Sequence, residues 1–361
     1  MKGEWVTAER AEEVRAAARG WRRAGAVSEG TFEEISRRYP EPRALPAPLW
    51  RVVTFVLASA VLLLATAALF VAASPRLSNA WILCAFAGAA FVLMAEIQAR
   101  SPAMALRGGV EAAGFWGIVF LVAGLFLLFQ ENLRISEPTG PNLVLAGAAL
   151  LFALAAWRWG SPAWAFLAAL SLFLLLGRAP AGRLLWIACG VALTFFFERF
   201  LDRPSWAPSH RRCAAVLVVA GLLGVYAALN LYALDHRFVE FLRERARDLP
   251  GPRFGERIWS TLGTAILPVA VVWWGVRSRR TFVLDTGLVL SALSLMTLRF
   301  YVHLAPIWVV LCVSGGILFL LALALNRWLA RGSEGERYGF TAEPLFADEA
   351  RLRALGYSLT A

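Results

Sequence analysis

Long runs of apolar residues, separated by short charged segments, occupy most of the chain between residues 52 and 325. Ten of these runs are candidate membrane spans, at residues 52–73, 78–97, 109–129, 141–157, 163–176, 182–197, 213–233, 258–276, 282–298 and 303–325. A helix needs roughly 17 to 25 residues to cross about 30 Å of hydrocarbon. The fourth to sixth runs and the ninth are short for that distance, so the pattern predicts eight to ten spans.

The runs predict helices, because they are apolar on every side and do not alternate between apolar and polar residues as the strands of a membrane barrel do. The stretch VLASAVLLLATAALFVAA, at residues 56–73, is typical. Hydrophobic residues make up 59% of the chain and charged residues 17%, whereas soluble domains have roughly 25% charged residues. The sequence therefore predicts an all-α polytopic membrane protein with about ten transmembrane helices at residues 50–328. A small helical domain (1–49) precedes them, and a tail (329–361) follows.

The first 49 residues are charged throughout and have no early apolar core, so they do not resemble a signal peptide, and the first span is the expected insertion signal. Apolar residues recur in this region at helical spacing on both sides of an AGAVS connection: Val14, Ala18, Trp21, Phe32, Ile35 and Tyr39. Two helices in a hairpin are therefore expected. Ser28 can cap the second helix, Thr31 and Glu34 have capping-box spacing, and Pro40 ends the helix at Tyr39.

A hairpin of about forty residues is too small to be very stable alone without a disulfide, a metal or a partner. Its apolar side chains, Trp21, Phe32, Ile35 and Tyr39, are candidates for contact with the membrane domain, a neighbouring subunit or a separate protein. Phe340 in the tail is a further candidate for partner contact. For the hairpin and for the tail, packing against the chain's own membrane domain or loops is the alternative.

The hairpin followed by an apolar span resembles the N-terminal module of a bacterial family of predicted membrane proteins, the domain of unknown function 2157 type. The stretch GWRRAGAVSEGTFEEISRRYP carries the resemblance, at Trp21, Gly25, Val27, Ser28, Ile35, Tyr39 and Pro40. The resemblance covers about the first seventy residues. It implies a location in the bacterial inner membrane and many transmembrane helices, and it implies no established activity.

Arginines predict the orientation of the chain. Arg37, Arg38, Arg43 and Arg51 precede the first span, which by the positive-inside rule keeps the N-terminus in the cytoplasm. Ten spans then return the C-terminus to the same side. The segment 235–257 is an exception, rich in arginine and in acidic residues, so either the rule is weak there or a span is miscounted. Because the arginines are dispersed over loops, the net charge of +11 indicates contact with anionic lipid and not with nucleic acid.

Ionisable residues inside spans are candidate binding sites, because a charge in hydrocarbon is costly and is usually paired or faces a cavity. Asp285 lies about one turn into the ninth run and is a candidate proton or cation site. The alternative is an interfacial ion pair with Arg279 or Arg280, or a favourable interaction with the N-terminus of the helix. Glu96 and Glu111 flank a loop that contains arginines, so Glu111 is a second candidate for which pairing with that loop is the alternative.

A basic pair precedes the last span, in the segment LRFYVHLAPIW. Arg299 and His303 are four residues apart and share a face if the helix is continuous, while Pro306 favours a break just beyond them. Such a pair could bind an anionic headgroup or substrate. Alternatively, both residues lie at headgroup level with Tyr301 and Trp308 as aromatic anchors.

Pro268 interrupts the eighth run, and helix interruptions often line the substrate site of transporters, although proline is also common in ordinary transmembrane helices. Thr286, Ser294 and Thr297 lie on one side of the ninth run and suit hydrogen bonds between helices. Gly221 indicates close packing of the seventh run against another helix.

Motifs of catalysis are absent from the sequence, which contains no HExxH, GxSxG or GxxxxGK[ST]. The four cysteines, Cys84, Cys189, Cys213 and Cys312, have no spacing typical of a metal site or a disulfide framework. The sequence thus predicts no enzyme, no cofactor and no metal. Two functions stay open: a transporter or flippase for a small solute or lipid, and a non-transporting assembly or sensing protein that recruits partners through the hairpin and tail.

Overall fold

The computed structural model describes residues 3–23, 26–39, 48–73, 80–100, 107–135, 139–179, 181–201, 203, 206–230, 254–278 and 280–302. Scattered positions between 312 and 341 are also described. Arg299 is among the helical residues, but its side chain is outside the described part of the chain.

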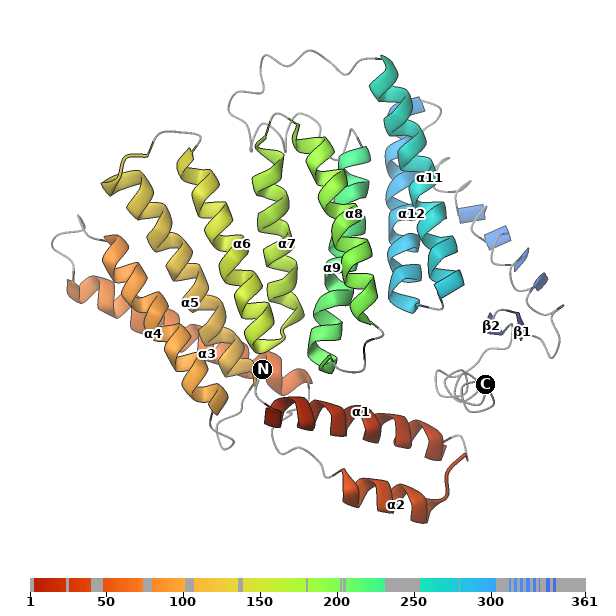
Figure 1. Cartoon of the computed structure of the whole chain (residues 1–361), viewed down its shortest axis with the longest axis horizontal. Coiled ribbons are helices and arrows are strands. Elements are labelled where there is room, and N and C mark those ends of the chain that lie inside the picture. Colours follow the sequence, from red (N-terminus) through yellow and green to blue (C-terminus); the bar gives the residue numbers. More distant parts are fainter. Residues whose placement is uncertain are drawn as a thin grey trace. The chain divides into compact units, whose positions relative to one another are not determined.

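Helices make up almost all of the described chain (Figure 1). The first two are α1 (Gly3–Arg23) and α2 (Glu29–Arg38). The apolar helices are α3 (Pro48–Ala73), α4 (Ala80–Arg100), α5 (Arg107–Leu127), α6 (Thr139–Trp159), α7 (Pro162–Gly177), α8 (Gly182–Leu201), α9 (Pro208–Leu229), α11 (Phe254–Ser278) and α12 (Thr281–Val302). A π-helical turn, Leu128–Asn132, extends α5. In the tail, β1 (Glu336–Arg337) pairs antiparallel with β2 (Phe340–Thr341).

Seven of the described helices are long and apolar enough to cross a membrane, and two shorter apolar helices occur at Pro162–Gly177 and Thr281–Leu295. Nine of the ten predicted runs are therefore helical, with ends that differ from the predictions by a few residues. The tenth, at 303–325, lies outside the described residues except for scattered helical positions. The chain is a helical, multi-pass membrane protein, and the predicted number of about ten spans is not confirmed.

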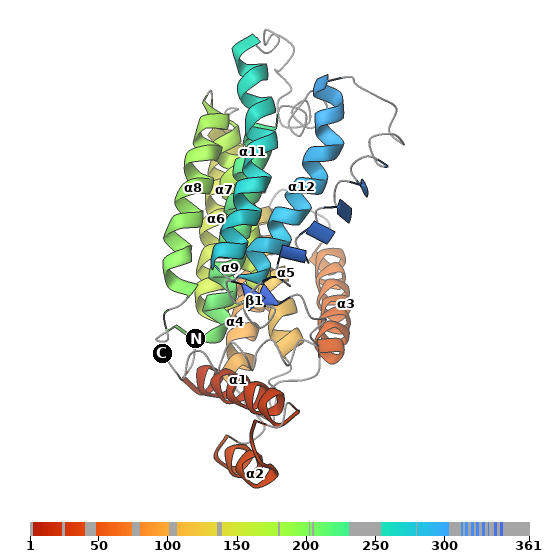
Figure 2. The same ribbon diagram turned by 90° about the vertical axis from the view of Figure 1, so that its right-hand side faces the viewer.

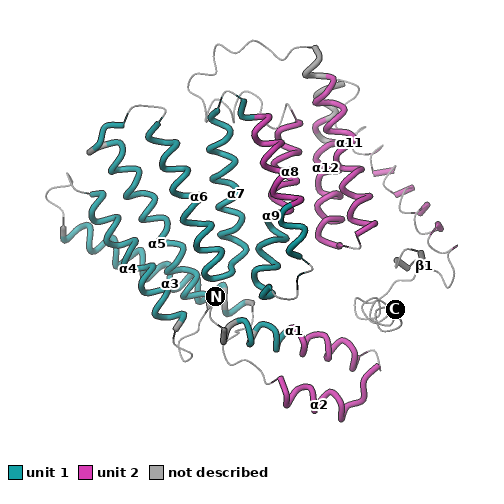
Figure 3. The backbone as a smooth tube through the Cα atoms, viewed as in Figure 1, with its two compact units in different colours: residues 1–12, 41–182, 196–217 teal, residues 13–40, 183–195, 218–361 magenta. Residues whose placement is uncertain are grey.

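The chain divides into two compact units (Figure 3). Unit 1 comprises residues 1–12, 41–182 and 196–217, and unit 2 comprises residues 13–40, 183–195 and 218–361. Helices α1, α8 and α9 each contribute residues to both units.

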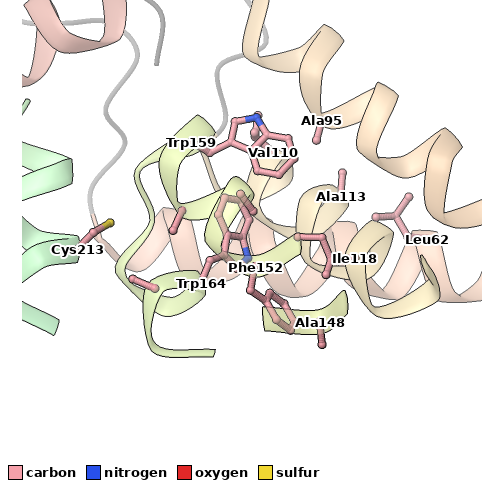
Figure 4. Packing of buried hydrophobic residues seen from close by; sticks show 13 residues of the cluster. Leu62, Ala95, Val110, Ala113, Ile118, Ala148, Phe152, Trp159, Trp164 and Cys213 are labelled. Carbon is pink, nitrogen blue, oxygen red and sulfur yellow. The ribbon is translucent and has the colours of Figure 1, made fainter. Parts of the chain in front are cut away.

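In unit 1, α5 is the central helix and packs against α3, α4 and α6, while α6 also packs against α7. The core contains many alanines, which let membrane helices approach closely. The rings of Trp159 and Trp164 lie 4.9 Å apart in this core, and Figure 4 shows both beside Phe152. A Cβ added to Gly88 of α4 would be 2.8 Å from the backbone oxygen of Gly117 of α5, so these helices meet at backbone distance.

In unit 2, α11 packs against α12, and Figures 1 and 2 both show the two helices side by side. Helices α8 and α9 cross at a pair of glycines. A Cβ on Gly190 would lie 2.6 Å from the backbone oxygen of Gly221, and a Cβ on Gly221 would lie 2.6 Å from that of Gly190. The predicted packing role of Gly221 is confirmed.

The predicted hairpin consists of α1 and α2. Ser28 caps α2 by accepting a hydrogen bond from the backbone nitrogen of Thr31 at 3.3 Å, and the helix is followed by Tyr39, as predicted. The predicted capping box of Thr31 and Glu34 is not used, because α2 already begins at Glu29. Arg22 of α1 pairs with Glu29 at 2.8 Å, and its guanidinium lies 4.3 Å from the ring centre of Phe32.

Candidate functional site

Polar side chains of α8, α9, α11 and α12 meet inside unit 2, beside the proline of α11. Pro268 has no backbone N–H, so the carbonyl of Thr264, four residues earlier, lacks the partner that a regular helix would supply. The hydroxyl of Ser294 on α12 donates to this carbonyl at 2.7 Å. Thr264, Pro268 and Ser294 are all buried, so the bond is shielded from solvent. Ser294 thus satisfies a carbonyl that the proline leaves open.

Tyr226 and Asn230 extend this bond into a chain of hydrogen bonds. Oγ of Ser294 lies 3.2 Å from the hydroxyl oxygen of Tyr226. Ser294 is the donor in this contact too, so its one proton is shared between the carbonyl of Thr264 at 2.7 Å and the Tyr226 hydroxyl at 3.2 Å. The amide nitrogen of Asn230 donates to the Tyr226 hydroxyl at 3.2 Å. Tyr226 therefore links Asn230 to Ser294 and, through Ser294, to the Thr264 carbonyl.

Thr297 links the same network to the next turn of α12. The second amide proton of Asn230 is directed to Thr297 Oγ1, at a nitrogen to oxygen distance of 3.1 Å. The Thr297 hydroxyl itself donates to the carbonyl of Leu293 at 2.9 Å. Asn230 directly follows α9, and its backbone nitrogen donates to the carbonyl of Tyr226 at 2.9 Å. One buried asparagine thus holds the end of α9 to α12.

Arg183 supplies the positive charge at this end of unit 2. Its Nε and Nη2 donate to the carbonyl of Ala228 at 3.1 and 3.0 Å, and Nη2 also lies 3.2 Å from Oγ of Ser260 on α11. Ala228 is in the last turn of α9, where backbone carbonyls have no partner within the helix and the helix dipole favours a cation. Arg183 therefore caps α9 and connects it to α8 and α11.

The hydroxyl of Thr264 is the group of this network with spare hydrogen-bonding capacity. Thr264 is 0% exposed, and its Oγ1 has no hydrogen-bond partner in the described part of the chain. The network, defined as Arg183, Tyr226, Asn230, Thr264, Ser294 and Thr297, contains hydroxyls, one amide and one guanidinium. It can therefore bind a polar group by hydrogen bonds, and it contains no acid and no histidine that could transfer protons at neutral pH.

The ionisable residues predicted as sites are not part of this network. Asp285 is exposed on α12, and no ion pair joins it to Arg280 among the described residues; Arg279, the other arginine of the predicted pairing, lies outside them. Glu111 is half-buried on α5 in unit 1. The side chains of Arg299 and His303 lie outside the described residues.

Glu96 forms an ion pair with Arg158 at the end of α6, and the loop with which it was expected to pair lies outside the described residues. The partner lies 62 residues away in the sequence, so charge spacing along the chain did not reveal it. No group of three or more histidine, cysteine, aspartate or glutamate residues among the described positions could hold a metal ion.

The predicted partner-contact residues lie on the hairpin and in the tail. Trp21, Phe32, Ile35 and Tyr39 are half-buried, and α2 contains no fully buried residue. Phe340 lies in β2, and its side chain is outside the described part of the structure. The hairpin therefore keeps part of its apolar surface accessible.

Sequence reasoning found part of the network. The predicted hydrogen bonds between helices are confirmed for Ser294 and Thr297, whereas Thr286 donates to the carbonyl of Phe282 within its own helix at 2.7 Å. Thr264 was missed, although its position four residues before Pro268 is a usable signal. Arg183, Tyr226 and Asn230 carry no comparable signal in the sequence.

Comparisons with protein-family models, with curated proteins and with solved structures find no match for this chain.

Proposed function

We propose that the chain is a transporter of small polar solutes, and that the network of Arg183, Tyr226, Asn230, Thr264, Ser294 and Thr297 contacts the solute. The observation that carries this proposal is a buried chain of hydrogen bonds beside a proline-interrupted helix, within apolar spans. Polar groups inside membranes are costly and mark solute pathways. Interrupted helices expose backbone and side-chain polar groups to bound solutes in many transporters.

The chemistry of the network limits the class of solute. Hydroxyls and a carboxamide both donate and accept hydrogen bonds, and the one charged group, Arg183, is a cation. The network has no carboxylate to neutralise a cationic solute. Neutral solutes with several hydroxyl groups, or small anions, are therefore the favoured class.

The orientation and location belong to the same proposal. The arginines before the first span favour a cytoplasmic N-terminus, and the resemblance to the domain of unknown function 2157 type implies the bacterial inner membrane. The start of α8 and the end of α9 then lie toward the outer face, so Arg183 and Asn230 are at the outer end of the network. A tenth span would return the C-terminus to the cytoplasm.

A ligand screen with one isosteric variant tests the proposal. Thr264→Val keeps the shape of the side chain and removes a hydroxyl that has no described partner, so the stability of the ligand-free protein should not change. The purified chain is screened by thermal unfolding against pools of sugars, polyols and small organic anions. A solute at about 100 times its Kd stabilises the folded state by about 2.7 kcal/mol.

The expected result is a solute that stabilises the wild type and loses its effect in Thr264→Val. Thr66→Val is the matched control, because Thr66 is also buried but donates to the carbonyl of Leu62 in its own helix at 2.7 Å. The proposal would be contradicted if the solute stabilised Thr264→Val as much as the wild type. It would also be contradicted if no solute stabilised the wild type and uptake were unchanged after deletion of the protein.

A second function is favoured by the hairpin. Phe32, Ile35 and Tyr39 lie on one side of α2 and stay half-exposed, which suits recruitment of a protein partner for assembly or sensing. A photo-crosslinker placed at Phe32 should then capture one defined protein in cells. Capture of this chain's own segments alone would argue against recruitment.

A further inference from the structure

An aromatic cluster occupies one end of unit 1, where α6 and α8 end and α9 begins. We define it as Trp157, Phe196, Phe197, Phe200, Trp206 and His210. Phe200 stacks on Trp206 with ring centres 4.4 Å apart, and Trp206 lies 6.4 Å from Trp157 and 6.1 Å from His210. Phe196 contacts Phe200 at 5.0 Å. The rings thus form one continuous aromatic surface across three helices.

Hydrogen bonds fix the helix ends under this cluster. His210 Nε2 lies 2.9 Å from the carbonyl oxygen of Trp157. Because a carbonyl can only accept, Nε2 carries the proton, and His210 caps the last turn of α6. The carboxylate of Glu9 on α1 accepts a hydrogen bond from the backbone nitrogen of Ser209 at 3.1 Å and so already occupies the N-terminus of α9. Any further anion at this end must therefore be held by side chains and not by the helix dipole.

Arginines with available donors lie beside residues of the cluster in the sequence, and one of them contacts a ring. The guanidinium of Arg203 lies over the ring of Phe200, 4.7 Å from its centre. Arg199, Arg203 and Arg212 are exposed, and none of the three forms an ion pair or side-chain hydrogen bond with a described residue. Stacking on a ring uses the face of a guanidinium and leaves its N–H edge free for a phosphate.

Two of the rings are as exposed as the arginines. Trp157 is 66% exposed and Phe196 is 56% exposed. In a membrane protein, exposed rings at the end of a span lie where acyl chains meet headgroups. Apolar surface for an acyl chain and guanidinium groups for a phosphate are therefore present at the same end of unit 1.

We propose that this surface is a binding site for an anionic phospholipid of the surrounding leaflet. The acyl chains lie against Trp157 and Phe196, and the phosphate contacts Arg203 and Arg212. Charge complementarity selects this occupant: residues 198–212, from the last turn of α8 to the start of α9, contain four arginines, Arg199, Arg203, Arg211 and Arg212, and two acids, Glu198 and Asp202. The site does not depend on the transport proposal, because it lies in unit 1 and shares no residue with the network of α8, α9, α11 and α12.

The test compares lipid binding by the full chain and by arginine variants in detergent. Native mass spectrometry follows retention of phosphatidylglycerol and of phosphatidylcholine during titration. Each arginine near an anionic lipid surface contributes about fivefold in affinity, so Arg203→Gln/Arg212→Gln should bind phosphatidylglycerol about 25-fold more weakly. Binding of phosphatidylcholine should not change. Both arginines are exposed, so the variant should keep the unfolding temperature of the wild type.

A control uses Arg277 in the last turn of α11, whose guanidinium lies 5.5 Å from the ring centre of the exposed Trp273. Arg277→Gln removes one charge outside the aromatic cluster and should change phosphatidylglycerol binding less than twofold, whereas each arginine of the site should contribute about fivefold. Equal losses in the two variants, or equal binding of the two lipids by the wild type, would overturn the proposal. Competition by glycerol 3-phosphate at the same concentration as the lipid would also overturn it, because the acyl-chain contacts would then contribute nothing.

Discussion

The hydrogen bond between Ser294 and Thr264 allows a direct test of the role of the proline. Ser294→Ala removes the hydroxyl that donates to the buried carbonyl of Thr264. Pro268 has no N–H to donate to this carbonyl in its place. A buried acceptor left without a donor costs about 1–3 kcal/mol. Ser294→Ala should therefore destabilise the purified protein by that amount in an equilibrium unfolding titration in mixed detergent micelles.

Ser291→Ala is the matched control on the same helix. The hydroxyl of Ser291 donates to the carbonyl of Gly287 at 2.8 Å, one turn earlier in α12. That carbonyl accepts the helical N–H bond as well, so loss of the hydroxyl leaves no open acceptor. Ser291→Ala should therefore lower the free energy of unfolding by about 0.6 kcal/mol, the average for side-chain hydrogen bonds in membrane proteins.

A double-mutant cycle then isolates the contribution of the proline. In Pro268→Ala the chain regains an N–H four residues after Thr264. This N–H can donate to the Thr264 carbonyl, which otherwise accepts from Ser294. In that background Ser294→Ala should cost less, with a coupling energy of about 1–2 kcal/mol between the two sites. Equal costs of Ser294→Ala in both backgrounds would refute the reasoning, and so would a Ser291→Ala cost as large as that of Ser294→Ala.

Two further substitutions test contacts in other parts of the chain. Gly221→Ala places a Cβ 2.6 Å from the backbone oxygen of Gly190 and should destabilise the protein by about 1–3 kcal/mol. The same change at Gly20 meets nothing within 4 Å and should stabilise α1 by up to about 1 kcal/mol; thermal unfolding that ranks the two variants equally would contradict the packing. Glu9→Ala removes the acceptor of the Ser209 amide, so hydrogen exchange at Ser209 should accelerate about tenfold or more. Unchanged exchange there would show that Glu9 does not hold α1 to α9.

Local patterns in the sequence predicted the helices well, because hydrophobic length and capping chemistry are properties of short segments. Nine apolar runs are helices, and Ser28 and Tyr39 flank α2 as expected. The partner of a charged residue depends instead on which helices pack together. Glu96 and Arg158 meet only because α4 and α6 both pack on α5, and no local rule distinguishes that pairing from one with the adjacent loop.

The sequence predicted only part of the candidate site, because contacts between helices depend on which helices pack together. Ser294 and Thr297 repeat on one side of a helix, which is visible in the sequence and indicates a polar contact. Asn230 and Arg183 act at the ends of helices, and their partners are set by the close crossing of α8 and α9 at Gly190 and Gly221. Asp285 attracted attention as a charge within an apolar run, yet its position near the start of α12 leaves it exposed.

Access of water to Thr264 is the most direct test of the proposal that the network is a solute site. Thr264→Cys, made in a chain whose four native cysteines are replaced, is reconstituted in vesicles and treated with a membrane-impermeant thiol reagent. Thr66→Cys, at a buried position within α3, is the reference. Transport predicts that Thr264→Cys reacts from at least one side of the membrane and faster than Thr66→Cys. Absence of reaction at residue 264 from both sides would contradict a solute pathway through the network.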